Sequence, residues 1–263
     1  LDETLEGEEG DTGNSDASGD KKDLEFPASQ QKLMDKILSY EKPVIVVNMA
    51  GSAMNLSVAQ EKASAIIQAW YPGARGGKAV ADVIFGVKSP SGKLPVTFYK
   101  DISDIPDFED YSMENRTYRY YTGEPLYPFG YGLSYGQCVV KAVSAENVYS
   151  QEKEFEGIKF SVEIENKKDM ATDDVLQIYI KDTDTEYAVL NPALAAFKRI
   201  HLDGNDSDKV EISVDKKAFT SVDENGNREI TGKNFKVYAG FSQPDSRSEV
   251  LTGIKCKEIM CRI

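Results

Sequence analysis

The residues best suited to chemistry lie at the start of the chain, in the segment Thr4-Leu5-Glu6-Gly7-Glu8-Glu9-Gly10-Asp11. Four carboxylates fall within the six residues from Glu6 to Asp11. A carboxylic acid that keeps its proton near neutral pH can protonate the leaving oxygen of a glycosidic bond, and neighbouring carboxylates raise its pKa by like-charge repulsion. Glycines would let such a loop bend into an active-site opening. By residue type alone, an acidic surface loop is the commoner explanation.

Charge excludes several classes of partner. The chain has 31 basic and 44 acidic residues, a net charge of −13, and the first 25 residues carry −8 of it. This sign disfavours nucleic acid and anionic membrane surfaces as partners. No apolar run approaches the roughly 20 residues that a membrane span needs. A neutral ligand such as a sugar is compatible with this charge.

Metal and cofactor sites are not expected. The chain has three cysteines and one histidine, His201, without the spacing of a zinc site. The odd number of cysteines favours a reducing compartment such as the cytoplasm. The segment Gly76-Gly77-Lys78-Ala79 resembles a phosphate loop, but Pro72 and Ala79 replace required residues. A structural role is expected for His201, and a core position for Trp70.

The first hundred residues predict α/β structure. Helical periodicity covers Ser29–Tyr40 and Ser57–Trp70, and a short helix is expected over Lys78–Phe85, ended by Gly86. Buried strands are expected over Val44–Val47 and Leu94–Phe98. Strands that alternate with helices imply a mostly parallel sheet. Two strands are too few for a stable open sheet, which indicates that the amino-terminal part of this domain is missing.

The remainder of the chain predicts a Tyr-rich linker and an all-β domain. Residues 101–137 carry seven tyrosines and little periodicity, so we expect this linker to pack against another part of the protein. From Cys138 onwards, apolar residues alternate with polar ones in roughly seven short strands separated by turn signals. This pattern is typical of an antiparallel β-sandwich over 138–263.

Several motifs together resemble glycoside hydrolase family 3, the β-glucosidases and β-xylosidases, in its carboxy-terminal portion. The matching segments follow the family's order over nearly the whole chain. They are Ala65-Ile66-Ile67-Gln68-Ala69-Trp70-Tyr71-Pro72-Gly73, Gly76–Gly86, Pro90-Ser91-Gly92-Lys93-Leu94-Pro95-Val96-Thr97-Phe98, Arg116-Thr117-Tyr118-Arg119-Tyr120 and Tyr127–Tyr135. The last domain resembles the family's fibronectin type III-like module through Val175–Ile180 and Ala196–Ile200, with Ala196 where the family usually has Gly.

The resemblance implies a retaining exo-glycosidase that acts on a β-glycoside or oligosaccharide. Its Asp nucleophile would lie on an amino-terminal TIM-like barrel, which is absent here. Its general acid/base would be Glu6, followed in preference by Glu8, with Glu9 also open. The family's Asp-Arg pair that follows this loop is here Asp11-Thr12, which leaves the choice among these residues open. No cofactor or metal is implied.

Two other functions are compatible with the sequence. The chain could be a non-catalytic carbohydrate-binding or scaffold β-sandwich module, or a fragment without independent function. Carbohydrate-binding sandwiches usually present exposed aromatic platforms, whereas residues 138–263 contain no Trp. The chain begins at Leu1 without Met or a signal-peptide pattern, so we expect it to be the carboxy-terminal part of a longer protein. Its sugar specificity and oligomeric state are left open.

Overall fold

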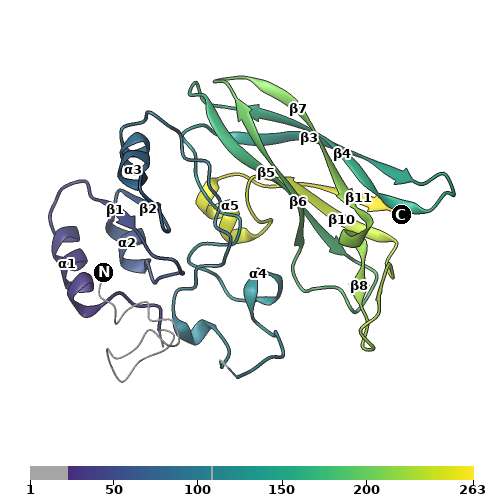
Figure 1. Ribbon diagram of the computed structural model, residues 1–263, viewed down its shortest axis with the longest axis horizontal. Helices are drawn as coiled ribbons and strands as arrows, with labels where there is room; N and C mark the ends of the chain where they lie inside the picture. Colours follow the sequence, from purple (N-terminus) through teal and green to yellow (C-terminus); the bar gives the residue numbers. More distant parts are fainter. Residues whose placement is uncertain (1–22, 108) are drawn as a thin grey trace. The chain divides into compact units, whose positions relative to one another are not determined.

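The computed structural model describes residues 23–107 and 109–263 (Figure 1). Glu6, Glu8 and Glu9 therefore lie outside the described residues, as does most of the acidic loop predicted over the first 25 residues. The chain divides into two compact units. Within the described residues, the first comprises 23–80, 98–107, 109 and Glu124–Leu126, and the second comprises Ala81–Thr97, Asp110–Gly123 and Tyr127–Ile263.

The first unit alternates short helices with short parallel strands. Its helices are α1 (Ala28–Leu38) and α2 (Ser57–Lys62), and its strands are β1 (Ile45–Asn48) and β2 (Ala65–Gln68). The two strands pair in parallel, with Ile45 opposite Ala65 and Asn48 opposite Gln68. The helix predicted over Ser29–Tyr40 and the strand predicted over Val44–Val47 are confirmed as α1 and β1.

Two predicted elements in this half of the chain are wrong. The helix predicted over Ser57–Trp70 ends at Lys62, and the next residues form β2. Ile66 and Ile67 are β-branched and favour a strand, but their spacing also fits one face of a helix, so periodicity alone could not decide. The strand predicted over Leu94–Phe98 is irregular except for a bridge at Phe98. The Leu94 backbone is still hydrogen-bonded: its N–H donates to the Tyr131 carbonyl, and its carbonyl accepts from the Gly130 N–H.

Short helices and irregular chain connect the strand-rich regions. Helix α3 (Gly76–Ile84) ends two residues before Gly86, close to the predicted position. The 3-10 helix η1 (Ile102–Asp104) and helix α4 (Thr117–Tyr120) lie in the Tyr-rich segment. The Tyr118 ring stacks on Phe129 at 4.0 Å and meets the edge of Tyr179 at 6.4 Å. The prediction that this segment packs against another part of the protein is thus confirmed for Tyr118.

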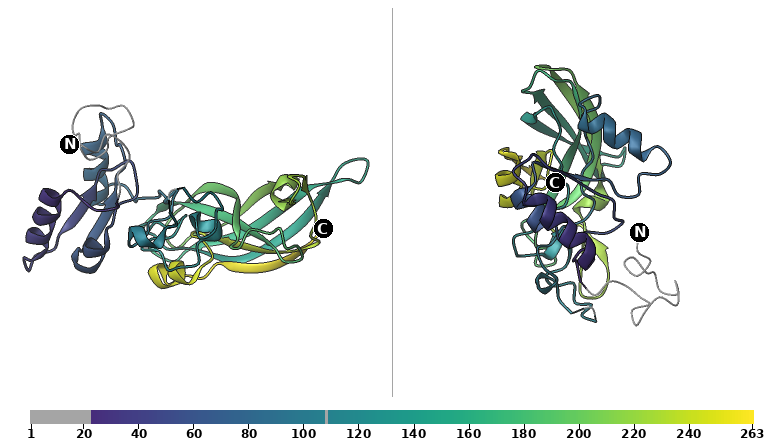
Figure 2. Two further views of the ribbon diagram at one scale, coloured as in Figure 1. Left: turned by 90° about the horizontal axis from the view of Figure 1, so that it is seen from below. Right: turned by 90° about the vertical axis from the view of Figure 1, so that its left-hand side faces the viewer.

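The second unit contains a β-sandwich of two antiparallel sheets. One sheet has the order β11-β10-β5-β6 and the other the order β3-β4-β7. A separate two-stranded ribbon, β8-β9, follows the 3-10 helix η2 (Lys216–Phe219), and helix α5 (Ser246–Thr252) precedes the last strand. The turn between β3 and β4 projects beyond the sheets (Figure 2, left). The bounds are β3 Cys138–Tyr149, β4 Phe155–Asn166, β5 Thr172–Asp182, β6 Ala193–Leu202, β7 Ser207–Asp215, β8 Ser221–Val222, β9 Arg228–Glu229, β10 Asn234–Gly240 and β11 Lys257–Arg262.

The predicted alternation of side chains places the core between these two sheets. On β4, Ile158, Phe160, Val162 and Ile164 are all buried, and the residues between them are less so. Successive side chains of a strand point to opposite faces, so a period of two fills one face with apolar groups. Phe219 on η2 closes one end of the core through edge contacts with Phe155 and Phe235. The antiparallel β-sandwich predicted for this region is confirmed.

The expectation of a mostly parallel sheet is wrong for the described residues. Only the β1–β2 pair is parallel, and the other strand pairs are antiparallel. The parallel part is a single two-stranded sheet, whereas the four-stranded and three-stranded sheets of the second unit are antiparallel. The fold is a mixed α/β region followed by antiparallel sheets. None of the described helices is both long and apolar enough to cross a membrane.

Candidate active site

The acidic segment enters the described structure at residues 23–25, where hydrogen bonds attach it to the first unit. The carbonyl of Leu24 accepts a hydrogen bond from the Asn55 N–H at 2.7 Å. The Asn55 side chain donates to the Glu25 carboxylate, also at 2.7 Å. Asn55 lies in the loop that follows β1, on the side of the carboxyl ends of the strands. The last residues of the acid/base loop predicted over the first 25 residues are therefore fixed at this edge.

Polar side chains link the carboxyl ends of the two parallel strands. Asn48, the last residue of β1, is buried and donates to the side-chain oxygen of Gln68 at 2.7 Å. Gln68, the last residue of β2, donates in turn to the carbonyl of Ala50 at 3.0 Å. These bonds fix the start of both loops that leave the sheet. Ligands of open α/β sheets bind at this edge.

Trp70 and Tyr71 follow β2 directly and add aromatic surface at the same edge. Trp70 has a positive φ of 53°, an uncommon conformation for a non-glycine residue that merits a functional interpretation. Its half-buried ring meets the edge of the buried Phe98 ring at 6.2 Å. The Tyr71 ring lies close to Gly51, and a Cβ there would come within 2.4 Å of the Tyr71 hydroxyl, so a larger residue would displace the ring.

This position of Trp70 corrects the sequence interpretation. We predicted a core residue at the end of a helical stripe, whereas Trp70 stands after a strand and is only half-buried. Aromatic rings beside an edge with amide side chains suit the binding of a sugar, which presents both apolar C–H faces and hydroxyl groups. The signal that could have revealed this is the run Trp70-Tyr71-Pro72-Gly73 directly after a β-branched strand.

The other residues singled out in the sequence lie in environments that suit a structural role. Gly76 and Gly77 begin α3. His201 is exposed on β6, where its Nδ1 lies 2.7 Å from the Asp173 carboxylate, which raises the pKa of the imidazole. Within residues 23–107 and 109–263, no group of three or more His, Cys, Asp or Glu side chains could hold a metal ion.

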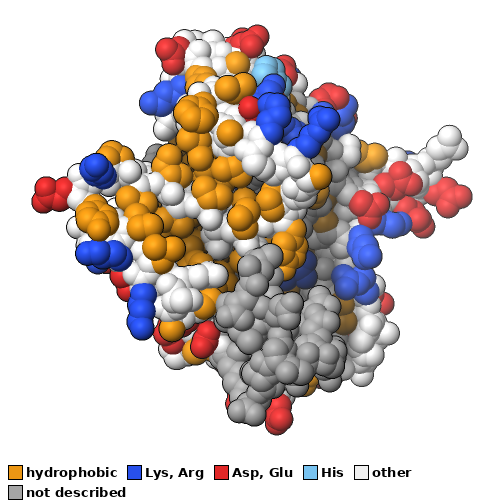
Figure 3. Space-filling model, turned by 60° about the vertical axis from the view of Figure 1, so that its left-hand side comes forward, with side chains coloured by type: hydrophobic (Ala, Val, Ile, Leu, Met, Phe, Trp, Pro, Cys, Tyr) orange, Lys and Arg blue, Asp and Glu red, His pale blue; other side chains and the backbone are white. Residues whose placement is uncertain are grey.

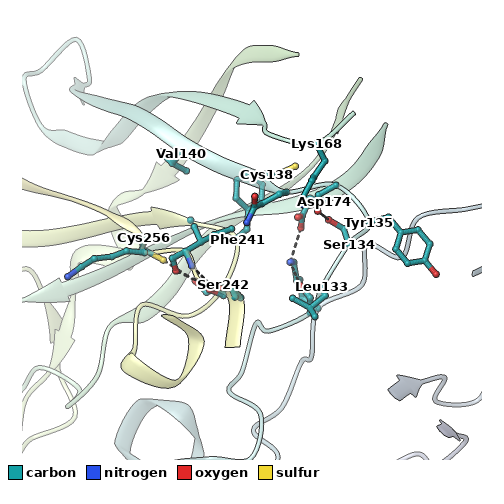
Figure 4. Close-up of a pocket in the computed structure, with 18 residues that line it drawn as sticks. Leu133, Ser134, Tyr135, Cys138, Val140, Lys168, Asp174, Phe241, Ser242 and Cys256 are labelled. Carbon is teal, nitrogen blue, oxygen red and sulfur yellow. Dashed lines mark hydrogen bonds and ion pairs between the residues drawn. The ribbon is translucent and has the colours of Figure 1, made fainter. Parts of the chain in front are cut away.

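The sequence did not indicate a buried ion pair in the second unit. Lys93 Nζ lies 2.8 Å from Asp174 Oδ1, and it also donates to the Gly132 carbonyl at 2.7 Å. The pair borders a cavity of about 220 Å³ (Figure 4). Burial raises the pKa of the Asp174 carboxyl, and the nearby Lys93 partly opposes this shift.

A buried carboxyl with a raised pKa could serve as an acid, but this cavity is poorly equipped for catalysis. Asp174 is held by Lys93 and by the Val175 N–H at 2.7 Å. Two thiols line the cavity, and burial raises the pKa of Cys138 and that of Cys256 to about 12. Both thiols are therefore protonated at neutral pH and are poor nucleophiles. The ion pair joins the segment that contains Lys93 to strand β5, which is a structural role.

Comparison with known proteins identifies both parts of the chain. The profile of the glycosyl hydrolase family 3 C-terminal domain matches residues 2–135, and that of the fibronectin type III-like domain matches residues 174–243. A xylan 1,4-beta-xylosidase of Xylanibacter ruminicola is 35% identical over 241 residues, which is 89% of this chain and 27% of that protein. A beta-glucosidase of Bacteroides ovatus is 31% identical, over 88% of this chain and 33% of that protein.

Solved structures support the same relationship. The structure of a beta-glucosidase of Erythrobacter marinus matches with a TM-score of 0.77 and 28% identity, over 94% of this chain and 32% of that chain. The chain thus spans about a third or less of the length of these relatives.

Proposed function

Because this chain belongs to glycosyl hydrolase family 3, we propose that it is the carboxy-terminal part of a retaining, exo-acting β-glycosidase. The whole enzyme would hydrolyse terminal, non-reducing β-linked sugars of oligosaccharides or simple β-glycosides. Relatives named as xylosidase and as glucosidase both match, so either sugar is a candidate. Such an enzyme needs two carboxyl groups, about 5–5.5 Å apart, and no metal or cofactor.

The proposal divides the catalytic residues between two parts of one protein. Glu6 is the general acid/base, with Glu8 and then Glu9 as the alternatives. The nucleophile is an Asp on an amino-terminal TIM-like barrel that precedes this chain. Residues 1–100 form the carboxy-terminal part of the α/β sandwich domain, 101–137 the linker and 138–263 the fibronectin type III-like domain. The chain alone would therefore lack the nucleophile.

The observation that supports these roles is the attachment of residues 23–25 to the loop after β1. The hydrogen bonds from Asn55 to Leu24 and Glu25 hold the end of the acidic segment at the carboxyl ends of β1 and β2. The amides of Asn48 and Gln68 and the ring of Trp70 lie at the same edge. A carboxylic acid on the preceding segment could thus work beside groups that suit a sugar.

The dependence of rate on the leaving group tests this assignment. In the full-length protein, Glu6→Gln should lower kcat/KM for an alkyl β-glycoside by about 10²–10⁴-fold, because a poor leaving group needs protonation. A dinitrophenyl β-glycoside should be affected much less. Glu8→Gln and Glu9→Gln are the matched controls. If Glu8→Gln alone shows this pattern, the role moves to Glu8; if none of the three does, the acidic segment is only a surface loop.

A non-catalytic carbohydrate-binding or scaffold module is not favoured. The family match includes residues 2–135 and thus the acidic segment. The relatives that cover 88–89% of this chain are named as glycosidases.

A further inference from the structure

The outer face of the four-stranded sheet is only partly covered by the rest of the second unit. On β5, Leu176, Ile178 and Ile180 point into the sandwich core. Because side chains alternate along a strand, the residues between them point outwards. The register of β5 with β6 places Asp173 opposite His201, Val175 opposite Arg199 and Gln177 opposite Phe197. These three pairs make up one strip of the outer face.

One end of this strip is buried by the Tyr-rich segment. Gln177 donates to the Gly130 carbonyl at 3.0 Å and accepts from the Tyr179 hydroxyl at 2.6 Å. Gly130 has a φ of 73°, and a Cβ there would come within 2.4 Å of the Gln177 oxygen and 2.5 Å of the Tyr179 hydroxyl. The Tyr118 ring completes the cover over Tyr179. An outward-facing glutamine and tyrosine are thereby fully enclosed.

The Tyr-rich segment that covers Gln177 and Tyr179 does not cover Phe197 on the neighbouring strand β6. Phe197, opposite the buried Gln177, is 67% exposed. Beside it, Asp173 orders two exposed side chains: its Oδ2 lies 2.6 Å from Arg199, and its Oδ1 lies 2.7 Å from His201. The histidine is the pale blue side chain in Figure 3, with basic side chains next to it and hydrophobic ones nearby. We call Asp173, Val175, Phe197, Arg199 and His201 the β6 face.

We propose that the β6 face is the docking surface for the part of the same protein that precedes Leu1. This inference depends on the proposed function, which assigns a barrel to that part. Continuity favours an occupant from the same protein, because the β6 face directly extends an outer face that another segment of the chain already covers. Length favours it as well, because the chain spans only 27% and 33% of two relatives.

The chemistry of the face defines what the occupant must supply. An apolar side chain of the occupant would remove the exposed Phe197 ring from water, which favours contact. Arg199 donates to Asp173 through one nitrogen, so its remaining N–H groups can donate to carboxylate or carbonyl oxygens of the occupant. The Asp173 bonds hold Arg199 and His201 in place before docking, which lowers the entropy lost on contact.

Hydroxyl-radical footprinting of the full-length wild-type protein tests the proposal without a mutation. Phe197 should be oxidised at least about tenfold more slowly than its exposure in this chain predicts, because oxidation would require the interface to open. Tyr149, which is exposed on β3 away from this strip, is the internal control and should react rapidly. Denatured protein gives the intrinsic reactivity of both residues.

Thiol labelling provides a second measurement. Phe197→Cys should react slowly with a maleimide in the full-length protein, and Tyr149→Cys rapidly. The natural thiols give little background, because Cys138 and Cys261 are buried and the pKa of Cys256 is raised to about 12. If labelling of Phe197→Cys is fast while Phe197 of the wild type is protected from oxidation, the substitution has opened the interface, and the proposal stands.

Three results would overturn the proposal. Rapid oxidation of Phe197 in an active full-length enzyme would leave the proposed function intact and refute the docking surface alone. Protection that appears only as protein concentration rises would identify a second copy as the occupant. Protection that appears only after addition of xylo- or cello-oligosaccharide would identify a glycan site. If the upstream sequence encodes no barrel, the proposed function itself fails, whatever Phe197 does.

Discussion

Replacing Lys93 with methionine should destabilise the second unit strongly at neutral pH. The Lys93 side chain is 10% exposed and that of Asp174 is 5% exposed, so the substitution leaves a carboxylate in the interior without its cation. The Val175 N–H and the Ser134 side chain remain as partners of Asp174, but the bond from Lys93 to the Gly132 carbonyl is also lost. Breaking a buried ion pair in this way lowers the free energy of unfolding by about 3–5 kcal/mol.

An exposed ion pair of the same length provides the matched control. Lys159 Nζ lies 2.8 Å from the Glu211 carboxylate, the same separation as in the buried pair, but the two side chains are 43% and 61% exposed. Lys159→Met should therefore change stability far less than Lys93→Met, because water screens an exposed ion pair. Urea unfolding followed by far-UV circular dichroism measures both variants. Fluorescence of Trp70, the one tryptophan of the chain, reports on the first unit. The urea midpoint that it gives should shift less than the midpoint from circular dichroism.

The pH dependence separates loss of the charge from loss of packing. Burial raises the pKa of Asp174 in the folded state above its usual value, so ionised Asp174 opposes folding at neutral pH. Removal of Lys93 should raise this pKa further. As the pH falls through that pKa, Asp174 becomes protonated and the deficit of Lys93→Met should shrink. The reasoning is refuted if the deficit does not change with pH, or if Lys93→Met and Lys159→Met have equal effects.

Three further predictions concern activity, folding and titration. The chain of residues 1–263 alone should not hydrolyse aryl β-glucosides or β-xylosides, because the proposed nucleophile is absent; turnover above that of a Glu6→Gln control would contradict this. Residues 138–263 alone should unfold cooperatively in urea, because both sheets and their shared core lie within them; a gradual loss of the strand signal would show that the segment does not fold alone. Asp173→Asn should lower the pKa of His201 towards its usual value, because Asp173 stabilises the charged imidazole; NMR titration of the single histidine measures this, and an unchanged pKa would rule out the contact.

The sequence predicted the β-sandwich better than the α/β region, and the physical reason is the length of the elements. Strand β4 runs from Phe155 to Asn166 with a clear alternation of buried and less buried residues. The strands β1 and β2 have only four residues each, which is too short for any periodicity. Ile66 and Ile67 therefore fitted a helix as well as a strand, and β2 was missed.

Contacts between distant residues could not be predicted from a single sequence. Nothing in the sequence around Lys93 or Asp174 indicates that the two form a buried pair, because the pair depends on how the chain folds back onto β5. The hydrogen bonds of Leu24 and Glu25 with Asn55 could not be predicted for the same reason. The acidic residues were recognised by type and by family resemblance, and their role as acid/base stays a prediction.

Analysis of the reaction products in azide tests most directly whether this chain supplies the acid/base. A retaining enzyme without its acid/base still forms a glycosyl-enzyme intermediate from an activated substrate, and azide can attack it without the help of a base. Full-length Glu6→Gln protein, given a dinitrophenyl β-glycoside and azide, should therefore regain rate and release a β-glycosyl azide, identified by NMR. A kcat equal to that of the wild type without azide, and only free sugar in its presence, would contradict the assignment of Glu6.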